Sequence, residues 1–275
     1  KCPIIITVHD IAYLRLPNLL NTSRKVYKKN ILQISIKKAE VIIVDSYATK
    51  KDIVEYFGIR EGKIRVIHLG VEGRFRPINN VESFRLKNNL PSKMILNVGT
   101  LEPRKNVVSL IKAFNELRKK GFKDYKLVIA GNKGWLYEEI FKEVIHSDLE
   151  REVLFLGVVK DKDLPVLYNC ADIFVYPSLY EGFGLPPLEA MACGIPVITS
   201  NTSSLPEVIG DAGIMVDPTD INSLCESMYI LLKDKELWNR MRNMGLERSK
   251  LFSWDKTAEK ILKVYDDVFS VHKYQ

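Results

Sequence analysis

Two carboxylates frame a glycine loop, which separates an expected strand from an expected helix: Glu181 stands before the loop and Glu189 lies within the helix. Gly182 and Gly184 let the backbone turn sharply and approach a ligand without interference from a Cβ atom. The amides of a helix N-terminus favour an anion such as a phosphate. Glu189 could accept hydrogen bonds from ribose hydroxyls, as acidic residues do in dinucleotide sites. These residue types therefore suggest a site for a phosphorylated ligand.

A plainer interpretation of the same residues stays open. Glu189 could only complement the helix dipole, and Glu181 could be a solvated loop charge. A glycine loop by itself is weak evidence for a ligand site.

His9 is the second candidate group, because it directly follows an expected strand over residues 4–8. Ligands of parallel sheets bind at the carboxyl ends of strands. The ordinary pKa of an imidazole lies near neutrality, so His9 could serve as a polar contact or in acid–base chemistry. A structural histidine that caps the strand is the alternative.

Arg104 and Lys105 form the third group, between a glycine turn at Gly99 and an amphipathic helix that begins near Val107. A guanidinium can bind phosphate oxygens in pairs, and an ammonium acts as a compact charge. The two cations therefore suit a diphosphate. Two exposed cations in the first turn of a helix are the alternative, which the helix dipole opposes.

The elements that must position these groups alternate between β-branched strands and helices, which predicts parallel sheets covered on both faces. A polar segment rich in Pro and Asn, residues 77–92, predicts a linker between two α/β domains. Strands are expected over residues 4–8, 41–44, 64–67, 94–98, 127–130, 153–156, 173–175, 197–199 and 214–216. Helices are expected over residues 22–38, 48–57, 163–170, 188–193, 222–233, 235–248 and 254–269, and from about residues 107 and 136.

The composition of the 275 residues, with 46% hydrophobic and 27% charged side chains, is that of a globular protein. No apolar run is long enough to span a bilayer. The histidines are isolated and no cysteine pair has metal-ligand spacing, so we expect no metal centre and reduced thiols in the cytoplasm. The cysteines are Cys2, Cys170, Cys193 and Cys225.

The net charge of +7 is uneven along the chain. Residues 1–90 hold 17 Lys and Arg against 8 Asp and Glu, whereas the remainder holds 24 against 26. The basic front segment, which includes the lysine-bearing helix over residues 22–38, could lie on an anionic membrane. A solvated positive face without a partner explains the charge equally well. No nucleic-acid motif is present, so a nucleic-acid partner is not expected.

The stretch from Glu181 to Glu189 resembles the E-x7-E signature of the retaining glycosyltransferases of family four, which have the GT-B fold. The resemblance continues through Ala190–Ile198. Further similar segments are Thr7–Asp10 (TVHD), His68–Val71 (HLGV), Phe75–Pro77 (FRP), Gly99–Asn106 (GTLEPRKN) and Leu205–Val208 (LPEV).

The resemblance implies two Rossmann-like domains with parallel sheets, of which the amino-terminal one is incomplete. Residues 1–76 would form part of the acceptor-side domain, and residues 93–255 would form the nucleotide-sugar domain. Residues 256–275 would be a terminal helix that crosses back to the first domain. The family's amino-terminal glycine-rich loop has no counterpart in this sequence, so we expect either a fragment or a separate amino-terminal half.

The resemblance also implies retaining transfer of a sugar from a nucleotide-diphosphate donor, GDP-mannose or a UDP-sugar, to a hydroxyl of a glycan or lipid-linked acceptor. The reaction would need neither a metal nor another cofactor. Two rivals stay open: a sugar-nucleotide epimerase or hydrolase with the same architecture, and a non-catalytic nucleotide-sugar-binding module. We expect the chain in the cytoplasm, with contact at the inner face of the membrane as a further expectation.

The roles that the resemblance assigns fall into two groups. His9 and Glu181 would act in catalysis, and a second set of residues would contact the donor.

Many members of the family carry an arginine directly after the first glycine of the diphosphate loop, where this sequence has Thr100. The donor would contact Thr100, Arg104, Lys105, Gly131, Val159, Gly182, Phe183, Gly184, Leu185 and Glu189.

Overall fold

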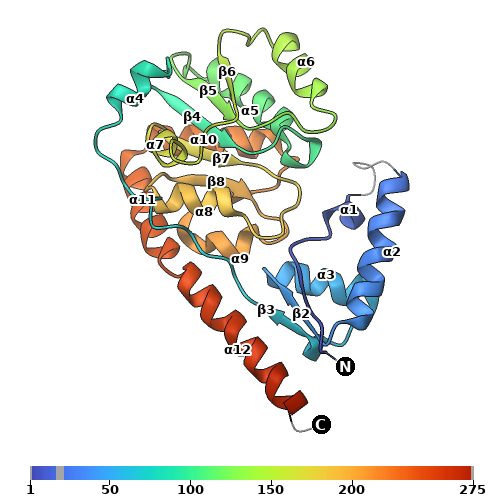
Figure 1. Cartoon of the computed structure of the whole chain (residues 1–275). Coiled ribbons are helices and arrows are strands. Elements are labelled where there is room, and N and C mark those ends of the chain that lie inside the picture. Colours follow the sequence, from blue (N-terminus) through green and yellow to red (C-terminus); the bar gives the residue numbers. More distant parts are fainter. Residues whose placement is uncertain (1, 17–21, 274–275) are drawn as a thin grey trace.

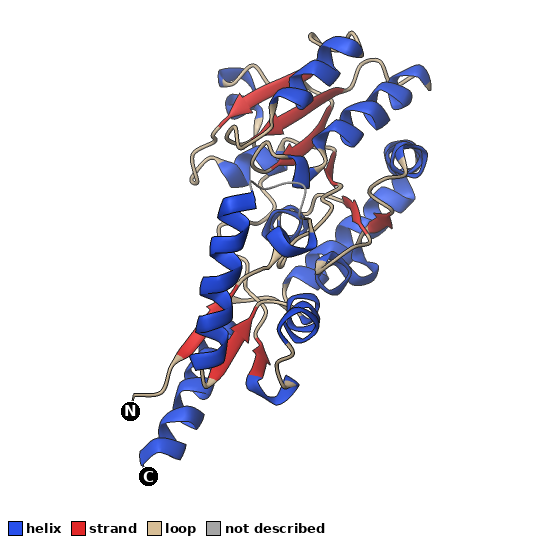
Figure 2. Ribbon diagram, turned by 90° about the vertical axis from the view of Figure 1, so that its right-hand side faces the viewer, coloured by secondary structure: helices blue, strands red, loops and turns tan. Residues whose placement is uncertain are grey.

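Two parallel sheets of different size organise the chain, as the computed structural model of residues 2–16 and 22–273 shows (Figure 1). The smaller sheet has the order β1-β2-β3, and the larger has the order β6-β5-β4-β7-β8-β9. Figure 2 separates the two sheets, with the smaller one beside the two termini. The predicted α/β class with parallel sheets is confirmed. The strands are β1 (Ile5–Val8), β2 (Val41–Val44), β3 (Ile64–Val66), β4 (Met94–Val98), β5 (Lys126–Ala130), β6 (Val153–Gly157), β7 (Ile173–Tyr176), β8 (Val197–Ser200) and β9 (Ile214–Val216).

Strands β2, β7 and β8 are buried along their whole length, and four of the five residues of β4 are buried. Strands with both faces covered read as continuous apolar runs rather than alternating ones. This is why the sequence alone located them closely.

Helices cover both faces of the larger sheet. Apolar side chains from α5, α6 and α10 pack on one face, and those from α7, α8 and α9 pack on the other. Helix α11 runs beside α8, where an added Cβ at Gly245 would lie 3.3 Å from Met191. The bounds are α5 (Val107–Lys119), α6 (Glu138–His146), α7 (Leu164–Asn169), α8 (Leu185–Ala192), α9 (Leu205–Ile209), α10 (Ile221–Lys233) and α11 (Lys235–Ser249).

The smaller sheet carries α1 (Ala12–Arg15), α2 (Thr22–Lys38) and α3 (Tyr47–Phe57). Ser46 caps α3 by accepting the amide of Thr49, and the helix ends at Gly58 with φ +63. Lys28 and Lys29 belong to the basic helix expected over residues 22–38, and their side chains lie outside the described residues.

The terminal helix α12 (Trp254–Lys273) packs on the opposite face of the smaller sheet through Val264 and Val268. Two segments of the chain therefore connect the smaller sheet's layer to the larger one. One precedes β4 in the chain and the other follows α11. They touch where Val71 forms a parallel bridge with Ser253. An added Cβ at Gly70 would lie 2.1 Å from the amide of Trp254, so only glycine fits this crossing.

The polar segment 77–92 contains a short helix, α4 (Glu82–Lys87), that the sequence did not predict. Val81, Phe84 and Leu90 pack against the core of the larger sheet, and Arg85 donates to the carbonyl of Cys170 at 2.8 Å. Three apolar anchors among polar residues are too sparse a pattern to predict a helix from periodicity.

Candidate active site

Backbone hydrogen bonds join the chain at the carboxyl ends of β4, β5 and β6. The amide of Gly99 donates to Ala130, and that of Gly131 donates to Gly157. An added Cβ at Gly131 would lie 1.8 Å from the carbonyl oxygen of Gly99, so the close approach requires glycine there. Thr100 lies exposed at this edge of the sheet, next to Gly99.

Glu181 is the centre of the site. Its Oε1 accepts hydrogen bonds from Lys105 Nζ at 2.7 Å, Tyr176 at 2.9 Å and Ser178 at 2.6 Å. Its Oε2 accepts from Arg104 at 2.9 Å. Glu181 is only 7% exposed, so the interpretation of it as a solvated loop charge is wrong.

Arg104 and Lys105 are not exposed first-turn cations either. They lie in a 3-10 turn, η3 (Pro103–Lys105), that precedes α5. The Arg104 guanidinium also donates to Glu102 at 2.8 and 3.0 Å and to the carbonyl of Tyr180 at 2.8 Å. Lys105 lies over the ring of Tyr176 and donates to its hydroxyl at 2.6 Å. The two predicted cations thus form a buried cluster with two carboxylates.

Opposing effects act on the protonation of this cluster. Burial favours the neutral form of Glu181, but the charges of Lys105 and Arg104 outweigh burial, so its pKa lies below the ordinary value. Burial lowers the pKa of Lys105, with Glu181 opposing and Arg104 reinforcing that shift. The carboxylate of Glu181 is therefore held in its charged form.

Sequence reasoning missed Glu102, Tyr176 and Ser178 in this cluster. Tyr176 is the last residue of β7, and Ser178 lies two residues beyond it. Polar groups at the carboxyl end of a central strand, directly before Glu181, are the signal that would have found them.

The glycine loop touches the end of β1. An added Cβ at Gly182 would lie 2.2 Å from the carbonyl oxygen of His9 and 2.9 Å from Cβ of Asp10. The structure thus brings together His9 and Gly182, two predicted site residues from opposite sheets. At Gly184, φ is +116, and an added Cβ would lie 2.7 Å from Leu205.

His9 is oriented by a buried carboxylate. Its Nδ1 lies 2.7 Å from Oδ2 of Asp45, and the side chains of His9 and Asp45 are 72% and 4% exposed. Asp45 directly follows β2, and Val8 pairs with Val44, so equivalent positions after neighbouring strands meet. Burial raises the pKa of Asp45, and the hydrogen bond to His9 opposes that rise without cancelling it. His9 and Asp45 each directly follow one of two neighbouring strands. This shared position could have identified Asp45 from the sequence, but it was not among the predicted residues.

The start of α8 offers fewer amide donors than the sequence suggested. Pro186 and Pro187 occupy its first turn and have no N–H, which leaves the amides of Gly184 and Leu185 for an anion. The expected anion site at this helix N-terminus is thus weaker than a helix start without prolines would give.

Phe183 does not present its ring to the site. The ring packs between His68 and Phe252, with centroid distances of 5.8 Å to each. The hydroxyl of Ser204 donates to the carbonyls of Glu181 at 3.0 Å and Phe183 at 2.7 Å. Only the backbone of Phe183 is therefore placed to meet a ligand at the loop.

Glu189 lies apart from the Glu181 cluster. It is the fifth of the eight residues of α8, and its Oε2 accepts the hydroxyl of Tyr168 at 2.8 Å. Burial raises the pKa of Glu189, and the hydrogen bond from Tyr168 opposes that rise without cancelling it. Because it stands beyond the first turn, complementing the helix dipole accounts poorly for Glu189.

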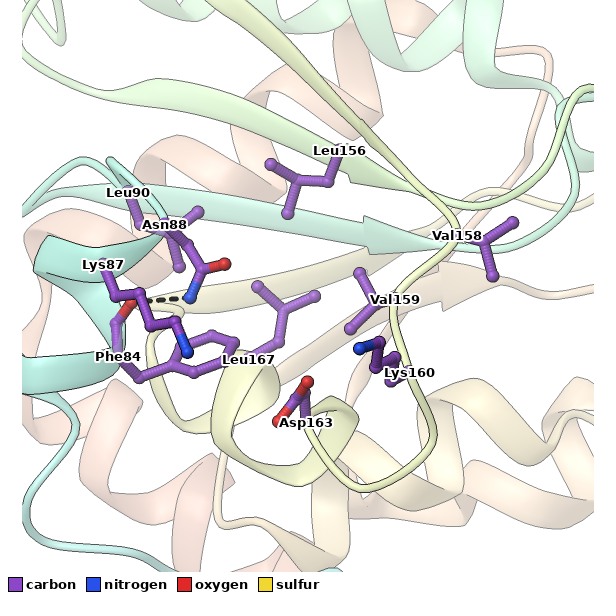
Figure 3. A pocket seen from close by; sticks show the side chains of 10 residues that line it. All are labelled: Phe84, Lys87, Asn88, Leu90, Leu156, Val158, Val159, Lys160, Asp163 and Leu167. Atoms are coloured by element: carbon purple, nitrogen blue, oxygen red, sulfur yellow. Dashed lines mark hydrogen bonds between the residues drawn. The ribbon is translucent and has the colours of Figure 1, made fainter.

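Val159 lines a pocket of about 330 Å³ between α4, α7 and the end of β6. Its side chain points into the pocket, whereas Val158 points away (Figure 3) and is 72% exposed. The other lining residues are Phe84, Lys87, Asn88, Leu90, Leu156, Val158, Lys160, Asp163 and Leu167.

Glu207 makes a second contact between the two sheets. Its carboxylate accepts the amides of Tyr47 at 2.9 Å and Ala48 at 3.1 Å, the first two residues of α3, and it lies 3.2 Å from Nε2 of His68. Glu207 belongs to α9, so a residue of the larger sheet's layer caps a helix of the smaller one.

Within residues 2–16 and 22–273, no group of three His, Cys, Asp or Glu side chains could hold a metal ion. In the same part of the chain, no helix has both the length and the apolar character to cross a membrane.

Comparison with known families decides the lineage. Residues 79–248 match the family described as glycosyl transferases group 1, and residues 1–73 match glycosyltransferase family 4. The chain belongs to the group 1 glycosyltransferases. The family predicted from the Glu181–Glu189 motif is thereby confirmed.

Relatives of this glycosyltransferase include the O-antigen chain mannosyltransferase B of Escherichia coli, 34% identical over 95% of the chain and 69% of that protein. Sucrose-phosphate synthase from Thermosynechococcus elongatus has a similar structure, with a TM-score of 0.83 and 26% identity over 97% of the chain and 68% of the synthase. The Anabaena protein HepE, solved with UDP and glucose, gives a TM-score of 0.83 at 20% identity over 96% of the chain and 71% of HepE. These neighbours confirm the GT-B fold.

Proposed function

We propose that this glycosyltransferase transfers a sugar, with retention of configuration, from a nucleotide-diphosphate donor to a hydroxyl of a growing glycan or lipid-linked acceptor. The mannosyltransferase activity in the name of the Escherichia coli relative makes GDP-mannose the first donor to test, and the UDP bound by HepE makes UDP-sugars the second.

The Lys105–Glu181–Arg104 cluster is the observation that carries the proposal. It lies at the carboxyl end of the larger sheet, beside the loop that contacts His9. Glu181 and Tyr176 take two of the three ammonium donors of Lys105, and the third can face the donor diphosphate. A preorganised positive charge stabilises the leaving diphosphate without reorganisation during transfer.

Glu181 is better suited to holding these cations than to attacking the sugar. Three hydrogen bonds converge on its Oε1 and a guanidinium pairs with Oε2. A carboxylate with its oxygens so engaged is a poor nucleophile. We therefore favour retention by attack on the same face from which the diphosphate departs, with no protein nucleophile.

The remaining roles follow from position. Glu189, with Tyr168 on one oxygen, would accept the ribose hydroxyls, and the loop at Val159 would meet the base. His9, fixed by Asp45, would orient the sugar or the acceptor from the smaller sheet. Lys105 and Arg104 would supply the positive charge that a metal supplies in other transferases, so we propose a metal-independent reaction.

The acceptor would enter from the side of the smaller sheet. Membrane contact would come from the basic front segment, in which Lys37 and Lys38 of α2 are exposed. We propose the acceptor and an anionic membrane as partners of the protein in the cell.

A donor-turnover assay tests the function. GDP-mannose and UDP-sugars are incubated with and without a mannosylated acceptor, and products are followed by mass spectrometry and by the anomeric proton signal. Acceptor-dependent transfer with the donor's anomeric configuration supports the proposal. Donor turnover at the same rate without acceptor would indicate a hydrolase or epimerase, and donor binding without any turnover would indicate a binding module.

A further inference from the structure

Tyr180 links the smaller sheet's layer to the cation cluster. Its hydroxyl donates to Oδ2 of Asp52, in α3, at 2.5 Å, and its carbonyl accepts from Arg104 at 2.8 Å. Tyr180 and Asp52 are 6% and 5% exposed. Since Tyr180 directly precedes Glu181, a single residue joins α3 to the loop that carries the central carboxylate.

Asp52 is itself held from the other side. Its Oδ1 accepts from Nε and a terminal nitrogen of Arg15 at 2.8 and 2.5 Å. One oxygen is thus committed to Arg15 and the other to Tyr180. Burial and the hydrogen bond to Asp52 raise the pKa of Tyr180, so its hydroxyl keeps the proton that it donates.

Thr49 provides a second contact from the same face of α3. Residues three apart lie on one face of a helix, and the hydroxyl of Thr49 lies 3.4 Å from the carbonyl oxygen of His9 and 3.5 Å from that of Gly182. Helix α3 therefore meets the loop at Tyr180 and at Gly182, on both sides of Glu181.

We propose that Asp52 is a positioning residue for sugar transfer: through Tyr180 it holds the Glu181 loop, and with it the Arg104–Lys105 pair, in the arrangement that stabilises the transition state. This inference rests on the proposed function, because the donor site is what is positioned. Docking of α3 thereby couples the relative placement of the two sheets to assembly of the cation cluster.

Tyr180→Phe is the sharpest variant, because it removes one hydroxyl and leaves Asp52 paired with Arg15. A hydrogen bond to a charged group is worth enough that its loss should lower kcat about tenfold to a hundredfold. The donor KM should change less than about threefold, because the loss falls on the transition state rather than on ground-state binding.

Two other substitutions separate positioning from general stability. Asp52→Asn keeps an acceptor for the Tyr180 hydroxyl and should retain most of kcat, whereas Asp52→Leu should lose it. Combining Asp52→Leu with Tyr180→Phe should be no worse than the poorer single variant, because both break one contact. Tyr56→Phe is the matched control: Tyr56 lies on the same helix and donates to Leu14 at 3.3 Å, away from the loop.

The kinetic experiment compares kcat and donor KM of these variants with the wild type, using the donor that the turnover assay identifies. A Tyr180→Phe enzyme with the kcat of the wild type, or one no slower than Tyr56→Phe, overturns the inference and leaves the proposed function intact. A wild-type protein that neither binds nor transfers from any nucleotide sugar overturns both.

Discussion

The ammonium group of Lys105 lies 2.7 Å from Oε1 of Glu181, although 76 positions of the chain separate them. Both side chains are buried, and Arg104 approaches the other oxygen of the same carboxylate. The positive charge that would meet a diphosphate in the proposed function is thus held in place by a carboxylate of the chain itself. Under the proposed function, this arrangement accounts for an acidic residue at the centre of a site for an anionic donor.

Glu181→Gln should destabilise the protein by about 3–5 kcal/mol at neutral pH, because it leaves Lys105 and Arg104 short of a counter-charge. Urea denaturation of the variant beside the wild type measures this difference.

The pH dependence of that difference has a defined sign. The folded-state pKa of Glu181 lies below its ordinary value of 4.5, so its contribution is complete above that value and is lost as the pH falls through the folded-state pKa. The gap in unfolding free energy between wild type and Glu181→Gln should therefore narrow as the pH falls below about 4.5. A gap that stays constant or widens on acidification would contradict the ion-pair assignment.

Glu189→Gln should behave in the opposite way. Burial raises the pKa of Glu189, so the folded protein binds its proton more tightly and stability falls as the pH rises through the interval above 4.5. The uncharged variant should be at least as stable as the wild type at neutral pH, because it avoids a buried charge. Thermal unfolding of the variant and the wild type at neutral pH measures the difference in stability. A clearly less stable variant would contradict the prediction, because it would show that the Glu189 carboxylate is stabilised by its surroundings.

Gly182→Ala should separate the glycine loop from the end of β1, since the new Cβ would meet the carbonyl oxygen of His9 at 2.2 Å. Transfer activity should fall by at least about tenfold, a loss typical of misplaced catalytic groups. Gly62→Ala is the matched control, because no atom lies within 4 Å of its added Cβ. Equal activity of the two variants would show that the loop contact is not needed.

Glu207→Ala should cost about 1–2 kcal/mol of stability, as loss of a helix N-cap does, because the first two amides of α3 lose their acceptor. Hydrogen exchange of the amides of Tyr47 and Ala48 should quicken more than that of the larger sheet. Substitution of the exposed Glu150 by alanine should change neither quantity.

The sequence predicted the strands of both sheets because buried parallel strands are continuous apolar runs that need no knowledge of partners. It also predicted Lys105, Arg104 and Glu181 as members of one site. It could not predict that they bind one another, because such pairing depends on strand order: β4 and β7 are adjacent in the sheet but far apart in the chain.

The same limit applies to Asp52 and Tyr168. Each is an ordinary residue of its own helix, and it becomes significant only through a partner more than 20 positions away. Helix α4 escaped prediction for a different reason, because three anchoring side chains are too few to give a helical period.

Calorimetric titration of the wild type and of Lys105→Met with GDP-mannose and UDP-sugars tests whether Lys105 binds the donor diphosphate. The control is Lys112→Met, whose ammonium lies on α5 and pairs with Glu143 at 3.6 Å. Circular dichroism establishes that each variant is folded before it is titrated. One donor should bind the wild type and Lys112→Met alike, and Lys105→Met should bind it about tenfold to a hundredfold more weakly, as expected for loss of a hydrogen bond to a charged group. Unchanged affinity in a folded Lys105→Met protein would contradict the assignment of Lys105 to the donor diphosphate.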